Sequence, residues 1–251
     1  MTSRGQQGGL GFLWRGQRDW HWGIQTSLYR HVRRRVNRVP TQVEFERREQ
    51  QIWSAFVEAG LNTASSLMAN LALMEHHGVP TRLLDVSTDF WPALYFACEP
   101  QAATAGEDEA GLVLGFGLSR SSQQISASVR SLDILRARLS RSRTAMLYRP
   151  LGVTPRIWAQ RGAFLVGAYY KGSGERLTFR WQVPEWSDDT FAAMLTGKFR
   201  VGRPLENAPL LALRIPAKVK AGVAQYLRLA YRLEPRTIYP DIEGFARTID
   251  T

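Results

Sequence analysis

Hydrophobic residues recur along the chain in patterns that predict a mixture of helices and strands. Apolar positions follow helical spacing over 43–59, which ends at Gly60, and over 64–76. Short apolar runs over 10–17 and 81–87 are typical of buried strands. Similar patterns predict further helices over 92–98, 132–139 and 217–230 and after Pro240, and further strands over 111–118, 163–170 and 210–215.

The order of these elements predicts the fold class. Helices and strands alternate irregularly, which differs from the regular strand–helix repeat of a doubly wound parallel sheet. We therefore predict an α+β fold with a mixed or antiparallel central sheet flanked by helices. Residues 1–9 are predicted to be a flexible N-terminus, and 10–251 one domain, because we find no internal repeat and no long linker.

Charge and composition limit the kinds of partner. Lys and Arg total 33 and Asp and Glu total 22, so the net charge is +11, and a basic cluster lies over 31–38. This balance favours a polyanionic partner such as a nucleic acid, a dinucleotide or an acidic protein. Arginine on the surface of a protein from a GC-rich genome explains the charge equally well, and this alternative stays open.

The number of cysteines and the length of the apolar runs bear on where in the cell we expect the protein. Cys98 is the one cysteine of the chain, so an intramolecular disulfide and a Cys-based zinc site are excluded. No apolar run reaches the roughly 20 residues that span a bilayer. We expect a cytoplasmic protein without membrane association, and we expect no metal, because the 4 histidines lack ligand spacing.

Several ordered motifs resemble those of the bacterial FRG-domain family. They are LWRGQRDWHWGIQTSLYR (13–30), LALMEHHGVPTRLLDVSTDFWPALYFAC (71–98), RIWAQRGAFLV (156–166) and RTIYPDIEGFAR (236–247). The resemblance implies an FRG domain over 10–251. Departures are Trp14 in place of Phe or Tyr, Glu75 in place of Gln, and Val86-Ser87 in place of Trp-Thr. Genes of this family often lie beside bacterial defence genes, so the resemblance also implies a toxin or anti-phage effector with a neutralising or sensor partner protein.

The strand and helix layout around these motifs is also similar to the ADP-ribosyltransferase fold, which implies NAD as a substrate. An Arg-Gly strand can hold ribose or diphosphate oxygens, and a later Ser can fix the nicotinamide side. The catalytic candidates are Arg15, His77, Asp85 and Gln160. The candidates for NAD binding are Arg15, Gly16, Gln17, Arg82 and Ser87.

The type of each candidate residue predicts what its backbone or side chain can do. Gly16 lets a ligand or another chain approach the backbone closely. In an extended strand, Asp85 and Ser87 point the same way and Arg82 points the opposite way. Gln160 stands where most such transferases have Glu, and a neutral amide cannot balance the positive charge that develops at the ribose. Asp85 is then the first candidate for the carboxylate and Glu75 the second.

Other interpretations of the same residues remain. Arg15 and Asp85 could form a buried structural ion pair, and His76 and His77 could cap the end of a helix. Three functions compete: an ADP-ribosyltransferase or NAD glycohydrolase, a nucleic-acid-directed effector, and a non-catalytic module that senses a nucleotide. Steep salt dependence would indicate phosphate contacts, and intact recovery of a bound nucleotide would indicate sensing.

Overall fold

The sheet at the centre of the fold forms because apolar side chains occupy its strands almost continuously. The computed structural model describes residues 11–99, 109–118, 124–126, 128–142, 145–150, 154–167, 169–170, 176–177, 209–242 and 245. Within these residues, six strands form one open antiparallel sheet in the order β4-β5-β2-β1-β3-β8. They are β1 (Gly11–Gln17), β2 (Leu83–Ser87), β3 (Gly111–Leu118), β4 (Met146–Tyr148), β5 (Gly162–Val166) and β8 (Pro209–Ile215).

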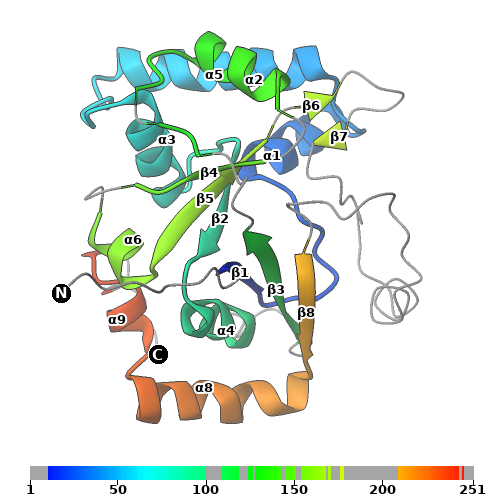
Figure 1. Ribbon diagram of the computed structural model, residues 1–251, viewed down its shortest axis with the longest axis vertical. Coiled ribbons are helices and arrows are strands. Elements are labelled where there is room, and N and C mark those ends of the chain that lie inside the picture. Colours follow the sequence, from blue (N-terminus) through cyan, green and yellow to red (C-terminus); the bar gives the residue numbers. More distant parts are fainter. Residues whose placement is uncertain are drawn as a thin grey trace, which may run out of the picture.

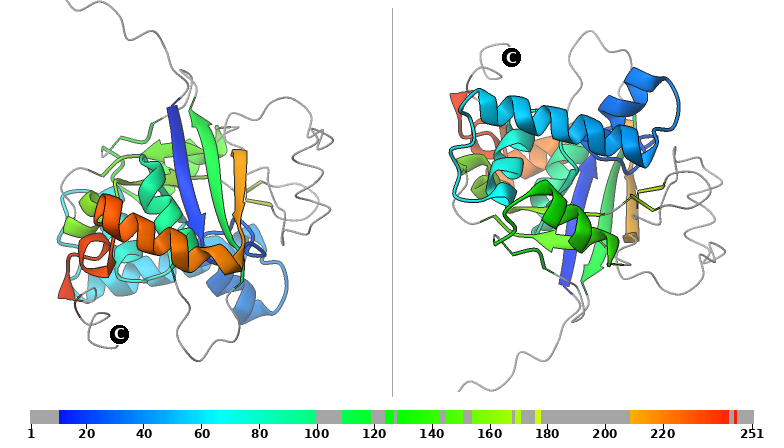
Figure 2. Two further views of the ribbon diagram at one scale, coloured as in Figure 1. Left: turned by 90° about the horizontal axis from the view of Figure 1, so that it is seen from below. Right: turned by 90° about the horizontal axis from the view of Figure 1, so that it is seen from above.

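Helices lie on both faces of this sheet. They are α1 (Ser27–Val36), α2 (Gln42–Glu58), α3 (Leu67–His76), α4 (Phe90–Cys98), α5 (Leu132–Ser140), α6 (Pro155–Ala159), α8 (Ala217–Tyr231) and α9 (Pro235–Ile238). Figure 1 shows α1, α2, α3 and α5 at one end of the molecule and α4, α8 and α9 at the other. When the molecule is seen from below, α8 lies in front of the strands, and from above α2 does (Figure 2). The fold is therefore α+β, as the sequence predicts.

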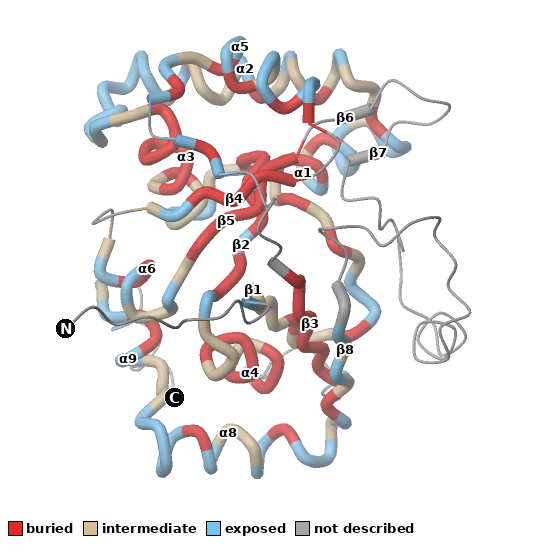
Figure 3. The backbone as a smooth tube through the Cα atoms, in the orientation of Figure 1, coloured by how far each residue is buried: buried red, intermediate tan, exposed pale blue. Residues whose placement is uncertain are grey.

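Side-chain alternation divides the core into three clusters. Leu13, Leu84 and Leu112 point to the face that α1 and α2 cover. On the other face, Val113 and Ile215 pack against α4 and α8. A third cluster joins α3 and α5 to side chains of β4 and β5. Figure 3 shows the result, with buried residues concentrated in the strands and in α4 and exposed residues along the outer sides of α2 and α8.

Local sequence signals explain several helix ends. Thr41 accepts a hydrogen bond from the Glu44 backbone, and the Glu44 side chain binds the Thr41 backbone, so α2 begins with a capping box. Gly60 and Gly78 have φ of 69° and 72°, a left-handed conformation that glycine adopts without strain at a helix end. Asp89 caps α4 through a hydrogen bond from the Trp91 amide.

Some predicted boundaries differ from the structure. The basic cluster 31–38 lies mostly in α1, which the sequence analysis did not assign as a helix. The strand predicted over 163–170 is β5 followed by the separate β6 (Tyr169–Tyr170), which pairs with β7 (Arg176–Leu177) in a two-stranded sheet. The helix predicted after Pro240 falls largely outside the described residues, and α9 precedes Pro240. The predicted flexible segment 1–9 lies outside them as well.

Candidate functional site

The two central strands of the sheet separate along most of their length. β1 pairs with β3 at every position, and β2 pairs with β5 at every position. Between β1 and β2, however, the register contains only Trp14 opposite Ser87. Beyond that pair the strands diverge, so Arg15 and Gly16 of β1 have no ladder partner on the Asp85 side. The sheet is therefore two half-sheets, β4-β5-β2 and β1-β3-β8, that join at one residue pair and form a fork.

A cavity of about 360 Å³ opens at this fork. It lies within the range of roughly 300–1,000 Å³ that is typical of small-molecule sites. Its walls come from β1, β2, β5, α3, α4 and α6 and from the residue that follows α9. The lining includes Trp14, Arg15, Gly16, Gln17, Arg18, Trp22, Glu75, His76, Asp85, Ser87, Phe96, Glu99, Arg156, Gln160, Phe164 and Tyr239.

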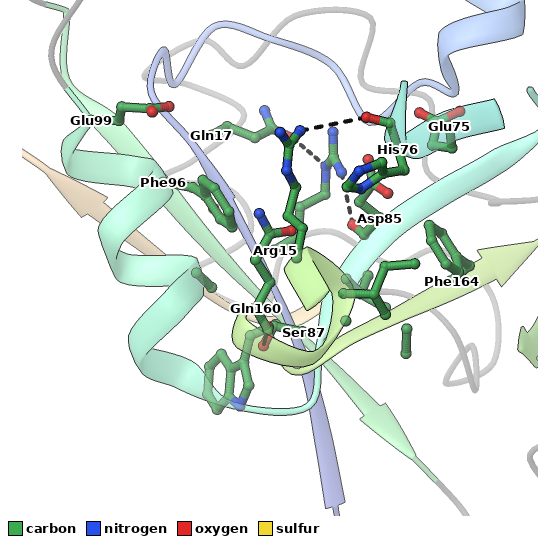
Figure 4. A pocket seen from close by; sticks show the side chains of 18 of the residues that line it. Arg15, Gln17, Glu75, His76, Asp85, Ser87, Phe96, Glu99, Gln160 and Phe164 are labelled. Carbon is green, nitrogen blue, oxygen red and sulfur yellow. Dashed lines mark hydrogen bonds between the residues drawn. The ribbon is translucent and has the colours of Figure 1, made fainter. Parts of the chain in front are cut away.

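Arg15 spans the fork. Its Nη1 donates to the backbone carbonyl of Asp85 at 2.8 Å, and its Nε donates to Oε1 of Gln17 at 3.4 Å. Figure 4 shows Arg15 between the α4 side of the cavity, marked by Phe96, and the β2 side, marked by Asp85. Burial lowers the pKa of Arg15 and the charge of Asp85 acts in the opposite direction, yet a guanidinium in a protein stays protonated. A positively charged side chain therefore lies across the fork.

Arg15 and Asp85 do not form the structural ion pair that the sequence left open. Within the described part of the chain, the contact of Arg15 is with the main chain of Asp85, and no carboxylate pairs with the guanidinium. The Asp85 side chain is exposed to the cavity. Because protein surrounds the base of the cavity, limited hydration raises the pKa of Asp85, while Arg15 and Arg30 act to lower it. A carboxyl group and a guanidinium therefore face one ligand-sized space.

Glu75 is a second carboxyl group in the same cavity. Its Oε2 accepts hydrogen bonds from Oγ of Ser27 at 2.7 Å and from Oγ1 of Thr81 at 2.5 Å. Burial raises the pKa of Glu75 to about 8, and the negative charge of Asp85 adds to this effect. The two hydroxyl donors and Arg30 act in the opposite direction. Glu75 therefore holds its proton more tightly than an exposed carboxyl group does.

Ser87 and Gln160 also line the cavity, and both make hydrogen bonds that hold the wall together. Ser87 is buried, and its Oγ donates to the backbone carbonyl of Gln160 at 2.8 Å. Nε2 of Gln160 donates to the carbonyl of Ile238 at 3.1 Å. The amide of Gln160 thus connects α6 to α9. Sequence reasoning located both residues at the site, and their contacts join its walls.

Gly16 is explained by helix packing. A Cβ atom on Gly16 would lie 1.8 Å from the carbonyl oxygen of Ala93 in α4. Gly111 on the neighbouring β3 has the same property, with the carbonyl oxygen of Ala97 at 2.1 Å. Of the two close approaches that the sequence allowed, a ligand or another chain segment, the structure shows the backbone of α4 against β1.

Two predicted site residues lie outside the cavity. Arg82 is buried on the opposite side of β2, where it forms an ion pair with Glu49 of α2 and its guanidinium lies over the ring of Phe45 at 5.5 Å. Strand alternation, which places Arg82 opposite Asp85, is the physical reason. His77 is exposed at the end of α3, and its neighbour His76 lines the cavity. The geometry therefore does not support an NAD-binding role for Arg82 or a catalytic role for His77.

Two residues of the cavity wall, His76 and Arg156, belong to a cluster around Asp241 that the sequence did not predict. Nη2 of Arg156 donates to Oδ1 of Asp241 at 2.6 Å, and Oδ2 of Asp241 lies 3.5 Å from Nε2 of His76. The Arg156 guanidinium lies over the ring of Tyr239 at 5.1 Å. The motifs RIWAQ and YPD carried this signal, but only the tertiary fold shows that they meet. The cluster fixes the C-terminal segment against α3 and α6.

The part of the chain that the structure describes contains no group of three or more His, Cys, Asp or Glu side chains that could hold a metal ion. Among the helices of this part, none has the length and apolar character that crossing a membrane would require.

Comparisons with known proteins identify one family. No curated protein and no solved structure matches the chain. The family model of the FRG domain matches residues 11–106, a segment that begins with β1 and extends past α4. It contains Arg15, Glu75 and Asp85, and therefore the diverging edges of the fork. The chain therefore contains an FRG domain over residues 11–106.

Proposed function

We propose that this FRG-domain protein uses NAD as a substrate, either as an ADP-ribosyltransferase or as an NAD glycohydrolase. One observation carries the proposal: Arg15 of β1 and Asp85 of β2, 70 residues apart in sequence, face one open cavity at the fork. A guanidinium suits phosphate or ribose oxygens, and a carboxylate suits a positively charged ribose.

The remaining lining is compatible with a nucleotide. The Arg18 guanidinium lies 5.3 Å from the centre of the Trp22 ring, and both residues line the same cavity as Arg15. Trp14 and Phe96 supply aromatic surface for a base or a nicotinamide ring. The cavity volume accommodates part of a dinucleotide, and the remainder would extend through the open mouth.

The chemistry that we propose requires one anion near the ribose. The bond between ribose C1′ and the nicotinamide nitrogen breaks, and its electron pair leaves with nicotinamide, which becomes neutral. Positive charge then develops on the ribose, and the ionised form of Asp85 stabilises it. Water or an acceptor group attacks C1′ and releases its proton to the Asp85 carboxylate. Gln160 is not required as a substitute for Glu in this scheme, because its amide is bonded to Ile238.

The test is release of nicotinamide from NAD by the purified protein. We expect Asp85→Asn and Arg15→Ala to reduce the rate by about 10²–10³-fold, the usual effect of removing one preorganised electrostatic group. Arg228→Ala is the matched control, because Arg228 is an exposed arginine of α8 outside the cavity. Absence of release by the wild-type protein, or equal rates for wild type and Asp85→Asn, would contradict the proposal.

We also propose that the activity serves a cytoplasmic toxin or an anti-phage effector, with a protein or nucleic-acid target and a neutralising or sensor partner. Expression in a bacterial host should then slow growth, and Arg15→Ala should relieve the effect. Equal toxicity of wild type and variant would argue against an effector role for this cavity.

A second candidate function is a non-catalytic module that binds a nucleotide or a nucleic acid. The exposed Arg33, Arg34 and Arg35 of α1 favour it, because they give this helix a strongly basic outer face. Binding through such arginines should weaken steeply as salt increases. Recovery of intact NAD after tight binding would favour this module over the enzyme.

A further inference from the structure

The hydrogen bonds around Glu75 assign different roles to its two carboxyl oxygens. The amide of Leu83 donates to Oγ1 of Thr81 at 3.1 Å, and the amide of Thr81 donates to Oγ of Ser27 at 2.9 Å. Each hydroxyl oxygen is thus an acceptor for a main-chain donor and has its own proton to donate. Both protons point to Oε2 of Glu75, although the Thr81 carbonyl is a second, longer partner for Ser27 at 3.2 Å. Oε2 is therefore an acceptor.

The other oxygen, Oε1, is the one available to a ligand. It forms no hydrogen bond with any described residue, and Glu75 lines the cavity. Figure 4 shows Glu75 on the same side of the cavity as His76 and Asp85. A proton on Glu75 belongs on Oε1, because Oε2 already receives two donors.

The charged groups around Glu75 favour its neutral form over that of Asp85. Burial raises the pKa of Asp85, and Arg15 and Arg30 act against it. Burial and the negative charge of Asp85 raise the pKa of Glu75 to about 8, although hydrogen bonds and Arg30 act against them. When two nearby carboxyl groups share a site, one ionises first and the other keeps its proton. Because Arg15 binds the main-chain carbonyl of Asp85, Asp85 is the better placed of the two to carry the negative charge, which leaves the proton to Glu75.

We propose that Glu75 is a hydrogen-bond donor that determines ligand specificity: its Oε1–H group binds an unprotonated oxygen acceptor, such as a phosphate or carbonyl oxygen, of the molecule in the cavity. The identity of that molecule as an ADP-ribosyl compound rests on the proposed function. Glu75 is a binding residue in this scheme and transfers no proton, because nicotinamide leaves as a neutral molecule without one.

The first test measures the affinity for ADP-ribose by calorimetry from about pH 6 to about pH 9.5. Above its pKa, Glu75 loses the donor and adds a second negative charge, so wild-type affinity should fall about tenfold per pH unit. Glu75→Ala should bind at least about tenfold more weakly at neutral pH, consistent with loss of one hydrogen bond to a charged group. In Glu75→Gln, the amide oxygen accepts from Ser27 and Thr81 and its N–H group faces the cavity. This variant should rescue binding and remove the pH dependence.

The second test needs no ligand and compares the free energies of unfolding of wild type and Glu75→Gln in urea. A carboxyl group whose folded pKa exceeds its unfolded value of 4.5 gives stability that is fully present below that value. This stability is lost as pH rises to about 8. Relative to Glu75→Gln, the wild type should therefore lose stability across this window. Glu58→Gln replaces an exposed carboxyl group on α2. Its free energy of unfolding should follow the same pH dependence as that of the wild type.

The outcomes separate the two proposals. If ADP-ribose binds the wild type with a flat pH profile, or if Glu75→Gln binds as weakly as Glu75→Ala, the donor role is wrong and the proposed function stands. If ADP-ribose binds neither wild type nor Glu75→Gln, the proposed function is wrong. The unfolding comparison then decides on its own whether Glu75 is neutral. If the difference in free energy of unfolding between wild type and Glu75→Gln does not change with pH, the inference is overturned.

Discussion

Arg15 and Arg82 show how far single residues could be assigned from the sequence. Both are arginines beside a recognisable motif, and both were candidates for NAD binding. Arg15 lines the cavity, whereas Arg82 pairs with Glu49 in the core. Alternation along a strand separated Arg82 from Asp85 in advance, but the pattern could not show which face held a ligand site. His77 missed the cavity by one position, because adjacent residues on a helix point in directions about 100° apart.

Replacing Arg82 should affect stability and leave ligand binding unchanged. Arg82→Ala would leave Glu49 buried with Arg136 as its one remaining cationic partner among the described residues. We expect a loss of about 3 kcal/mol in the free energy of unfolding, at the low end for a broken buried pair because Arg136 remains. Urea unfolding measures this loss, and calorimetry with ADP-ribose measures binding. A stable Arg82→Ala protein with impaired binding would restore Arg82 as a site residue.

At the scale of elements, the sequence predicted most helices and strands but not all of their limits. It missed α1, although Leu28, Tyr29 and Val32 already form an apolar face at helical spacing. The density of arginine on the outer side of this segment concealed the pattern. The fork could not be predicted either, because strand pairing depends on contacts between segments that are far apart in the sequence. The candidates from β1, β2 and α6 nevertheless meet in the cavity.

The close contact between α4 and β1 should make Gly16 intolerant of any side chain. Gly16→Ala would place Cβ against the Ala93 carbonyl, and overpacking of this kind costs about 1–3 kcal/mol or more. Gly222→Ala is the matched control, since Gly222 lies in α8 with no atom within 4 Å of an added Cβ. There the substitution should stabilise by about 0.5–1 kcal/mol. Thermal unfolding of both variants tests the contrast, and similar shifts would contradict the packing.

At the scale of the whole molecule, the described elements form one α+β unit in which α4 lies between the sheet and α8. Cys98 ends this helix and is buried between β3 and α8 side chains. It is the one cysteine in the chain. A thiol in this position reports on opening of the molecule as a whole.

Native protein should therefore resist thiol reagents. Burial raises the pKa of Cys98 to about 11, so the reactive thiolate is scarce at pH values below this. We expect modification by a disulfide reagent near neutral pH to follow unfolding, with slow reaction of native protein and immediate reaction in concentrated urea. Full modification of native protein during mixing would show that α4 detaches from the sheet without unfolding of the rest.

The single pairing of Trp14 with Ser87 gives distant core residues an influence on recognition. Because the gap between β1 and β2 results from the angle between two half-sheets, side-chain length alone does not set its width. Packing beneath β4 and β5 orients one half-sheet, and packing between β3, α4 and α8 orients the other. Substitutions in either of these packing regions can thus change the separation between Arg15 and Asp85 without contacting these two residues. Variants selected for altered ligand preference should accordingly include core positions remote from the bound molecule.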